Sequence, residues 1–318
     1  MDSLPIIDIS PLYRRDESVW RAVAGRIDRA CREWGFFYIE GHPIGAERIA
    51  ALSEQARRFF ALPLAEKLRI DIAGSRHHRG YGALAAEQLD PAQPGDCKET
   101  FDMGFHLPAD HPEVLAGKPL RGPNRHPALE GWETLLESHY RDMHELSCTV
   151  LRAIALALGI ERDFFDRRFR QPASVLRLIH YPPQHGAERP GAGEHTDYGC
   201  ITLLHQDRVG GLQVRDRRGE WIDAPPRDGT FVVNLGDMMA RWSNDRYRST
   251  AHRVISPRER DRYAMPFFAE PHPETAIACL PGCQDAERPP RYPPTTCAEW
   301  LLSRFAATYA HRRGDVAG

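Results

Sequence analysis

The residues of this sequence best suited to chemistry are two histidines and an acid in its second half. His195 and Asp197 are separated by one residue, and His252 follows later in the chain. Two imidazoles and one carboxylate can hold Fe(II) on one side and leave the opposite coordination positions open for O₂ and other small molecules. The pattern therefore predicts a mononuclear iron centre, and Arg262 is a candidate anchor for an anionic co-substrate.

These ligands need a framework that brings distant parts of the sequence together. Residues i and i+2 of a strand point to the same face, so a strand through His195 and Asp197 would present both ligands on one side. His252 opens a separate apolar run. Two other His-x-Glu pairs contain a proline and lie in loop-like sequence, and we expect neither to bind metal: His111-Pro112-Glu113 and His272-Pro273-Glu274.

The N-terminal third has the pattern of a mixed α/β region. Apolar spacing and the residues that end each run predict strands at 5–9 and 35–40 and helices at 18–34 and 46–60. Residues 76–124 are rich in Gly, Pro, Asp and His, which indicates an irregular covering segment with short strands such as 100–104. A long helix at 129–158 and a shorter one near 162–168 follow.

After residue 172 the pattern changes to short β-rich runs, at 175–181, 200–206, 211–215, 230–235, 252–255 and 262–268, and a last helix is expected at 296–312. Strands at this spacing favour a jelly roll with a cavity at one end. We therefore expect an α+β, mainly β fold with a double-stranded β-helix (jelly-roll) core. Its parts would be an N-terminal α/β region with the covering segment (1–125), a helical part (126–170), the jelly-roll core (171–280) and a C-terminal segment and helix (281–318), packed as one compact unit.

Composition excludes several classes of function. The formal net charge of the 318 residues is −2, which gives no positive field for nucleic acid or an anionic membrane surface. No apolar run approaches the roughly 20 residues needed to cross a bilayer, and the first residues have no leader pattern, so a cytoplasmic location without membrane partners is expected. The seven cysteines are scattered and are expected to be reduced thiols.

Several short motifs stand in one order along nearly the whole chain. They are residues 5–9, 35–44, Phe59-Phe60-Ala61-Leu62-Pro63 with Glu66-Lys67, Gly80-Tyr81, residues 98–102, His180-Tyr181-Pro182, residues 193–197, 210–214, 234–237, 242–244, 249–254 and 262–268. In this arrangement the sequence resembles the isopenicillin N synthase-like branch of the non-haem Fe(II)/2-oxoglutarate-dependent dioxygenases.

The resemblance implies that His195, Asp197 and His252 bind Fe(II), that Arg262 pairs with the distal carboxylate of 2-oxoglutarate and that the Tyr181 hydroxyl helps to hold it. It also implies O₂ as oxidant, ascorbate as an auxiliary reductant, and a small-molecule substrate that is hydroxylated, desaturated or cyclised while succinate and CO₂ are released. All but three of the 42 basic residues are arginine, so Arg262 gains its role from position rather than from residue type.

Four residues are candidates for the substrate pocket. Arg177 lies four residues before Tyr181 on the same strand face, Tyr81 and Phe101 belong to the covering segment, and Phe268 ends the last apolar run. Their chemistry does not identify the substrate.

One position departs from the family pattern. The family has Arg-x-Ser where this sequence has Arg262, Tyr263 and Ala264. Loss of a hydrogen bond to a charged group costs roughly 1.5–3 kcal/mol, so weaker 2-oxoglutarate binding, or a different carboxylate in its place, is expected unless water or another side chain substitutes for the serine. Three alternatives stay open: an oxidase of the isopenicillin N synthase type without 2-oxoglutarate, ethylene-forming-type fragmentation of 2-oxoglutarate, and a cupin-like binding protein without turnover.

Overall fold

Two β-sheets form the centre of the protein, which we describe from a computed structural model covering residues 3–14, 16–89, 95–184, 190–256 and 258–308. In these residues the larger sheet has eight strands, in the order β1 (Ile6–Asp8), β2 (Phe36–Glu40), β10 (Phe231–Leu235), β7 (Ile201–Gln206), β12 (Arg262–Ala269), β5 (Val175–Tyr181), β4 (Glu99–Gly104) and β3 (Gly80–Gly82). The smaller sheet has the order β6 (Pro190–His195), β11 (His252–Ile255), β8 (Leu212–Arg215) and β9 (Trp221–Asp223). A short pair, β13 (Ala276–Ile277) with β14 (Thr295–Thr296), lies outside both.

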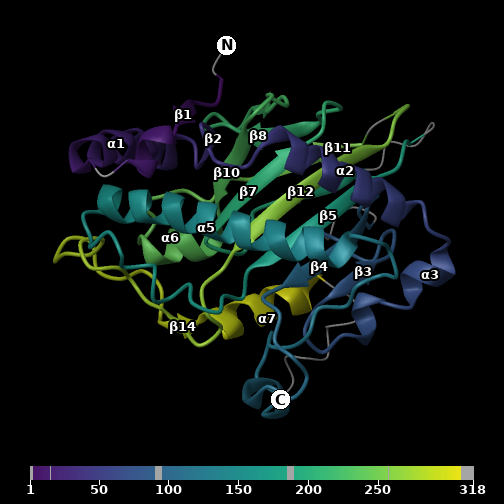
Figure 1. The fold of residues 1–318 in the computed structure, drawn as a ribbon. Helices are drawn as coiled ribbons and strands as arrows, with labels where there is room; N and C mark the ends of the chain where they lie inside the picture. Colours follow the sequence, from purple (N-terminus) through teal and green to yellow (C-terminus); the bar gives the residue numbers. More distant parts are fainter. Residues whose placement is uncertain (1–2, 15, 90–94, 185–189, 257, 309–318) are drawn as a thin grey trace.

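The helices are α1 (Glu17–Glu33), α2 (Ala46–Phe60), α3 (Leu64–Leu68), α4 (Pro112–Leu115), α5 (Trp132–Leu158), α6 (Asp237–Trp242) and α7 (Cys297–Thr308), with short 3₁₀ turns at Ser10–Tyr13 and Ile72–Gly74. The long helix α5 lies across the larger sheet, with α1 beside one end of it (Figure 1). None of the helices in the described part of the chain is long and apolar enough to span a membrane.

The larger sheet buries both of its faces because successive side chains of a strand point to opposite sides. On β12, Met265 and Phe267 pack in the core shared with α5, whereas Ala264 belongs to a second apolar cluster. This second cluster joins the two sheets and includes Ile179 of β5 and Val254 of β11. The jelly-roll prediction is confirmed, and the cavity side of the fold lies between the two sheets.

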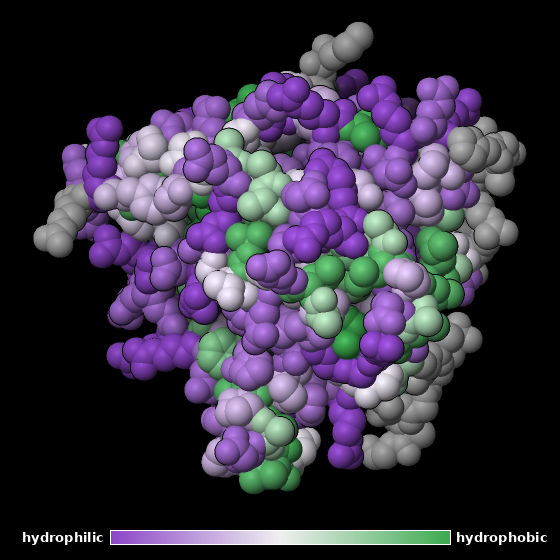
Figure 2. Space-filling view, turned by 45° about the vertical axis from the view of Figure 1, so that its right-hand side comes forward, coloured by the Kyte–Doolittle hydropathy of each residue, from purple (hydrophilic) through white to green (hydrophobic). Residues whose placement is uncertain are grey.

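The surface has the opposite character. Figure 2 shows a face of the molecule on which hydrophilic side chains predominate and apolar ones lie in small groups among them. The large apolar residues are mostly in the two clusters of the interior.

Most expected elements are found within one or two residues. The helix at 18–34 ends where expected because Gly35 takes a positive φ of 67°, and a Cβ there would lie 2.4 Å from the Arg248 carbonyl oxygen. The strands of the 76–124 segment differ from the expectation, since β3 and β4 do not cover the fold but extend the larger sheet beyond β5.

One further expectation needs correction, and one extends beyond the described residues. The segment at 162–168 is a series of turns closed by bonds such as Phe164 N–H to the Glu161 carbonyl, not a helix. The C-terminal helix is described over Cys297–Thr308, and residues 309–312 of the expected range lie outside the described residues.

Candidate metal centre

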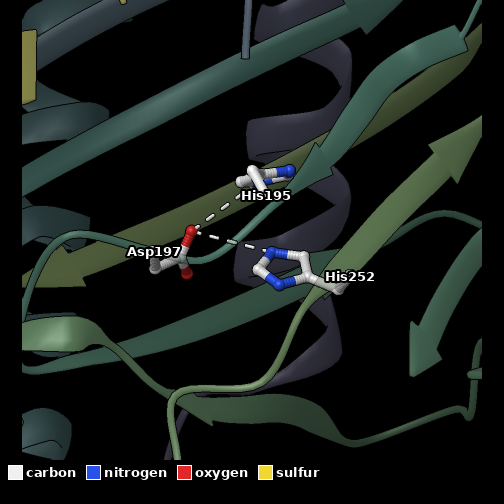
Figure 3. A group of neighbouring side chains, drawn as sticks. All are labelled: His195, Asp197 and His252. Atoms are coloured by element: carbon white, nitrogen blue, oxygen red, sulfur yellow. Dashed lines mark ion pairs between the residues drawn. The ribbon is translucent and has the colours of Figure 1, made fainter. Parts of the chain in front are cut away.

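The two histidines and the acid meet between the ends of two neighbouring strands. His195 is the last residue of β6 and His252 the first residue of β11, and these two residues are register partners in the antiparallel pair. Asp197 lies in the loop after β6, with Oδ1 3.8 Å from His195 Nε2 and 3.6 Å from His252 Nε2. Figure 3 shows the carboxylate directed towards both imidazoles. Their candidate ligand atoms lie within 4.8 Å of one another, so the group can hold one metal ion.

The route by which Asp197 reaches the histidines differs from the expectation. Strand β6 ends at His195, so the two-residue period of a strand does not place Asp197. The loop instead turns back towards α6, where the Asp237 N–H donates to the Asp197 carbonyl oxygen at 2.8 Å. Thr196, between the two ligands, donates through its hydroxyl to Asp237 and points away from the centre.

Hydrogen bonds fix the orientation of both imidazoles. His195 Nδ1 lies 2.7 Å from the Gly193 carbonyl oxygen, and His252 Nδ1 lies 3.1 Å from that of Thr250. A carbonyl oxygen requires a donor, so the neutral rings carry their proton on Nδ1 and leave the Nε2 lone pair for a metal. Both Nε2 atoms face Asp197 Oδ1.

Electrostatics favour the protonation states of His195 and Asp197 that a metal requires. Burial, with the adjacent His252, lowers the pKa of His195 to about 3, so this ring is neutral at ordinary pH. Burial alone would raise the pKa of Asp197, but the two histidines and hydrogen bonds from Asn234 and Thr202 outweigh it and lower the pKa. Neutral imidazoles and an ionised carboxylate are the ligand forms that bind a divalent cation.

A cavity extends from this centre between the two sheets. Alternate residues of the two central strands line it: Val175, Arg177, Ile179 and Tyr181 of β5, and Arg262, Ala264, Pro266 and Phe268 of β12. The expected common face of Arg177 and Tyr181 is therefore confirmed. Tyr198, Leu301 and Phe305 also line the cavity, and the Phe305 ring stacks on His78 at 4.5 Å between centroids.

Arg262 has the environment of an anion-binding residue. It is 1% exposed, its Nε donates to the Gly210 carbonyl oxygen and its Nη2 to Gln206 Oε1, and its guanidinium lies 4.7 Å from the Tyr181 ring. Its Nη1 is buried and has no hydrogen-bond partner among the described residues. A buried cationic donor without a partner is costly, and a carboxylate would satisfy it with a charge-assisted hydrogen bond. The site thus fits the distal carboxylate of 2-oxoglutarate.

The alanine that departs from the family pattern lies beside this arginine. Ala264 is 2% exposed and is the register partner of Gln206 in β7. Gln206 donates to the Ala224 carbonyl and accepts from Arg262. The guanidinium is therefore held from two sides by groups other than a serine hydroxyl.

The four candidate pocket residues divide into two groups. Arg177 and Phe268 line the cavity, with the Arg177 guanidinium 5.5 Å from the Phe268 ring. Tyr81 and Phe101 were expected in the pocket wall, but they lie in the core. The Tyr81 hydroxyl donates to Glu99 at 2.6 Å, and Phe101 packs edge-on against Trp132. Strand β4 is held in the sheet by its pairing with β5. In this arrangement the odd-numbered side chains of β4, such as Phe101, face α2 and α5 rather than the cavity.

The positive charge of Arg177 in the cavity wall is balanced by neighbouring acidic side chains. Its Nε and Nη2 donate to the two carboxylate oxygens of Asp102 at 2.7 and 2.8 Å, and its Nη1 lies 3.3 Å from Glu87. Lys98 contacts Glu87 at 2.8 Å and Asp96 at 3.0 Å. Arg177 and Lys98 are thus both paired with carboxylates of the chain.

Sequence reasoning missed three residues of the site. Thr202 and Asn234 donate to Asp197 Oδ2, and both are polar residues on apolar strands, which was an available signal. Glu270 lines the cavity and continues the alternation of β12 by one step beyond Phe268, so the same period could have found it.

The two other His-x-Glu pairs do not form metal groups. His111 Nδ1 accepts from the Glu113 N–H at the start of α4, and Glu274 pairs with Lys118 on the surface. Within the described residues, His195, Asp197 and His252 form the group of three that could bind a metal. The structure therefore brings together the three residues expected from the sequence.

Comparison with known proteins agrees with this geometry. Residues 172–271 match the 2OG-Fe(II) oxygenase superfamily, and residues 4–129 match the family described as non-haem dioxygenase in morphine synthesis N-terminal. The 2-oxoglutarate-Fe(II) type oxidoreductase hxnY of Emericella nidulans is 40% identical over 315 residues, covering 96% of this chain and 90% of the relative. The chain belongs to the 2OG-Fe(II) oxygenase superfamily.

Other members of the superfamily extend the comparison. A homoarginine-6-hydroxylase of Arabidopsis thaliana is 37% identical, covering 87% of this chain and 80% of the relative. A Neurospora crassa protein solved with alpha-KG and thymine superposes with a TM-score of 0.84 at 34% identity, covering 96% of both chains. This oxygenase is therefore an oxidoreductase that uses Fe(II) and 2-oxoglutarate, which disfavours the alternatives without 2-oxoglutarate or without turnover.

Proposed function

We propose that this oxygenase oxidises a C–H bond of a small-molecule metabolite, with His195, Asp197 and His252 as the iron ligands and Arg262 and Tyr181 as the anchor of 2-oxoglutarate. One observation carries the proposal: three convergent ligand atoms and an unpartnered buried arginine Nη1 border the same cavity. When bound, Fe(II) and 2-oxoglutarate supply the activation of O₂, with succinate and CO₂ as co-products.

The residues of the chain contribute binding, orientation and exclusion of water. The Gly193 and Thr250 carbonyls hold the imidazoles with Nε2 towards the metal position. Arg262 fixes the far end of the co-substrate by a charge-assisted contact, and the Tyr181 ring covers the guanidinium. Apolar wall residues such as Ile179 and Leu204 keep the cavity dry, which strengthens these electrostatic contacts.

The relatives support a small substrate. One is called a homoarginine-6-hydroxylase and another was solved with thymine. We infer that the substrate enters beside Arg177 and Phe268, on the part of the cavity wall away from Arg262. Hydroxylation, desaturation and cyclisation are all compatible with this arrangement, and a cytoplasmic location stays a prediction from the sequence.

The test is spectroscopic. Fe(II) and 2-oxoglutarate are added under anaerobic conditions, and the metal-to-ligand charge-transfer band of the chelate is recorded. O₂ is then admitted and succinate is measured. We expect the band and succinate from the parent enzyme and neither from His252→Ala. If the parent gave no band and no succinate, the proposed function would be wrong.

A further inference from the structure

Glu270 lies at the far end of the row of β12 side chains that line the cavity. Arg262, Ala264, Pro266 and Phe268 precede it at intervals of two residues. The Glu270 residue is 5% exposed, and its backbone is tied to Ser174 by two hydrogen bonds, at 3.1 and 3.0 Å. Its carboxyl packs over Gly199, where a Cβ would lie 1.9 Å from Oε1. The loop after Asp197 therefore leaves space for this carboxyl.

The carboxyl is only partly satisfied. The Cys200 N–H donates a hydrogen bond to it, but within the part of the chain that the structure describes, the buried Oε2 has no hydrogen-bond partner. Buried polar atoms are nearly always paired, and each exception needs an explanation. At the other end of the row, Arg262 Nη1 is also buried without a partner among the described residues, and there the proposed binding of 2-oxoglutarate would supply one.

2-Oxoglutarate cannot explain Glu270 as well. Eight residues of strand separate Glu270 from Arg262, which corresponds to about 26 Å at roughly 3.3 Å per residue. A five-carbon dicarboxylate is much shorter than this separation. One molecule of 2-oxoglutarate bound at Arg262 therefore does not account for the unpaired oxygen of Glu270.

The neighbouring charges indicate what a partner of Glu270 would carry. Lys98 is paired with Glu87 and Asp96, and Arg177 is paired with Asp102, so these cations already have carboxylate partners. Glu270 is a further acid in the same wall. Burial, together with the Asp197 carboxylate, raises the pKa of Glu270 to about 8, so the carboxyl is largely protonated at pH 7 when no cation lies beside it. A cation bound next to it would lower this pKa and leave the ionised, accepting form.

We propose that Glu270 determines substrate specificity by accepting a hydrogen bond from a positively charged nitrogen group, an ammonium or a guanidinium, of the substrate. The inference rests on the proposed function, because it places the substrate in the same cavity. The substrate class is a small cationic nitrogen compound whose charged group is bound at Glu270 while another part of the molecule lies next to the iron.

Matched probes test this class without knowledge of the natural substrate. Butylguanidine and butylamine carry the cation, and butylurea and butanol are their neutral counterparts. Each is titrated anaerobically into the enzyme with Fe(II) and 2-oxoglutarate, and the shift of the charge-transfer band reports binding. We expect the parent to bind at least one cation about ten- to a hundredfold more tightly than its counterpart, and Glu270→Gln to lose this preference.

The variants separate this inference from the proposed function. The charge-transfer band itself should form in the parent, in Glu270→Gln and in the control Glu54→Gln, which alters an exposed acid. A missing band in the parent would contradict the proposed function. A normal band with no cation preference in the parent, or with the same preference in Glu270→Gln, would overturn the role of Glu270.

Stability provides a second readout. A buried carboxyl oxygen without a partner opposes folding, so Glu270→Leu should keep or raise the thermal midpoint of the substrate-free enzyme. A purely structural carboxyl would behave in the opposite way, with a lowered midpoint and unchanged probe affinity in Glu270→Gln. That combination would show that Glu270 does not bind substrate.

Discussion

Asn234 donates its side-chain amide to Asp197 Oδ2 at 2.7 Å, and this bond leaves Oδ1 to face the two histidines. Thr202 donates to the same Oδ2 at 2.5 Å from the neighbouring strand β7. The ligand carboxylate is thus oriented by two strands of the larger sheet, whereas the histidines come from the smaller sheet. The metal centre therefore depends on how the two sheets pack.

The first prediction concerns this orientation. Asn234→Leu removes the amide donor with little change of volume and should weaken Fe(II) binding on the order of ten- to a hundredfold, as is usual when a residue that orients a metal ligand is lost. Thr202→Val should have an effect in the same direction. Competition with a chromophoric chelator measures the affinity. Parent-like iron affinity in both variants would show that the carboxylate needs no such support.

The second prediction concerns the co-substrate anchor. Ala264→Ser restores the hydroxyl of the family pattern beside Arg262 and should tighten 2-oxoglutarate binding by roughly tenfold, because a hydrogen bond to a charged group is worth about 1.5–3 kcal/mol before the cost of burying the hydroxyl. Arg262→Gln should weaken binding by roughly a hundredfold or more. Anaerobic titration of the charge-transfer band measures both. Unchanged affinity in Ala264→Ser would mean that the serine position does not reach the carboxylate in this chain.

The third prediction concerns the ion pair in the cavity wall. The Asp102 side chain is fully buried and binds the Arg177 guanidinium through both oxygens. Asp102→Ala should lower the free energy of unfolding by about 3–5 kcal/mol, because a buried guanidinium loses its main partner. Urea denaturation measures the change. The double variant with Arg177→Met should recover much of the loss, and a double variant as unstable as the single one would contradict this explanation.

The fourth prediction is a pH dependence of stability at His180. Burial alone would lower the pKa of His180, but hydrogen bonds to Glu99 and Asp261, each 2.7 Å long, outweigh it and raise the pKa. A raised folded-state pKa contributes stability that is fully present below the unfolded value of about 6.5 and is lost as the pH rises through the folded value. The thermal midpoint of the parent should therefore exceed that of Asp261→Asn most at about pH 6 and least near pH 9. Because Asp261 is half exposed, the difference should be small and should shrink in high salt. A gap that widens with pH would contradict the assignment.

The sequence by itself determined the ligand set and the faces of the central strands. His195, Asp197 and His252 could be separated from two similar motifs, because a proline and loop-like surroundings mark the other pairs. The alternation that puts Arg177 and Tyr181 on one face is a local property of an extended backbone, so it could be read without the fold.

The tertiary structure decided which of these faces meet. Tyr81 and Phe101 belong to the core because β4 pairs with β5, and strand pairing between distant segments is not encoded in either segment alone. Asp197 reaches the histidines through a loop rather than a strand, and its orientation depends on Asn234 from β10.

Glu270 also combines a feature that the sequence determines with one that only the packing decides. Its period on β12 is visible in the sequence, but its lack of a partner is a property of the packed interior, since only there does the loss of water make an unpaired oxygen costly.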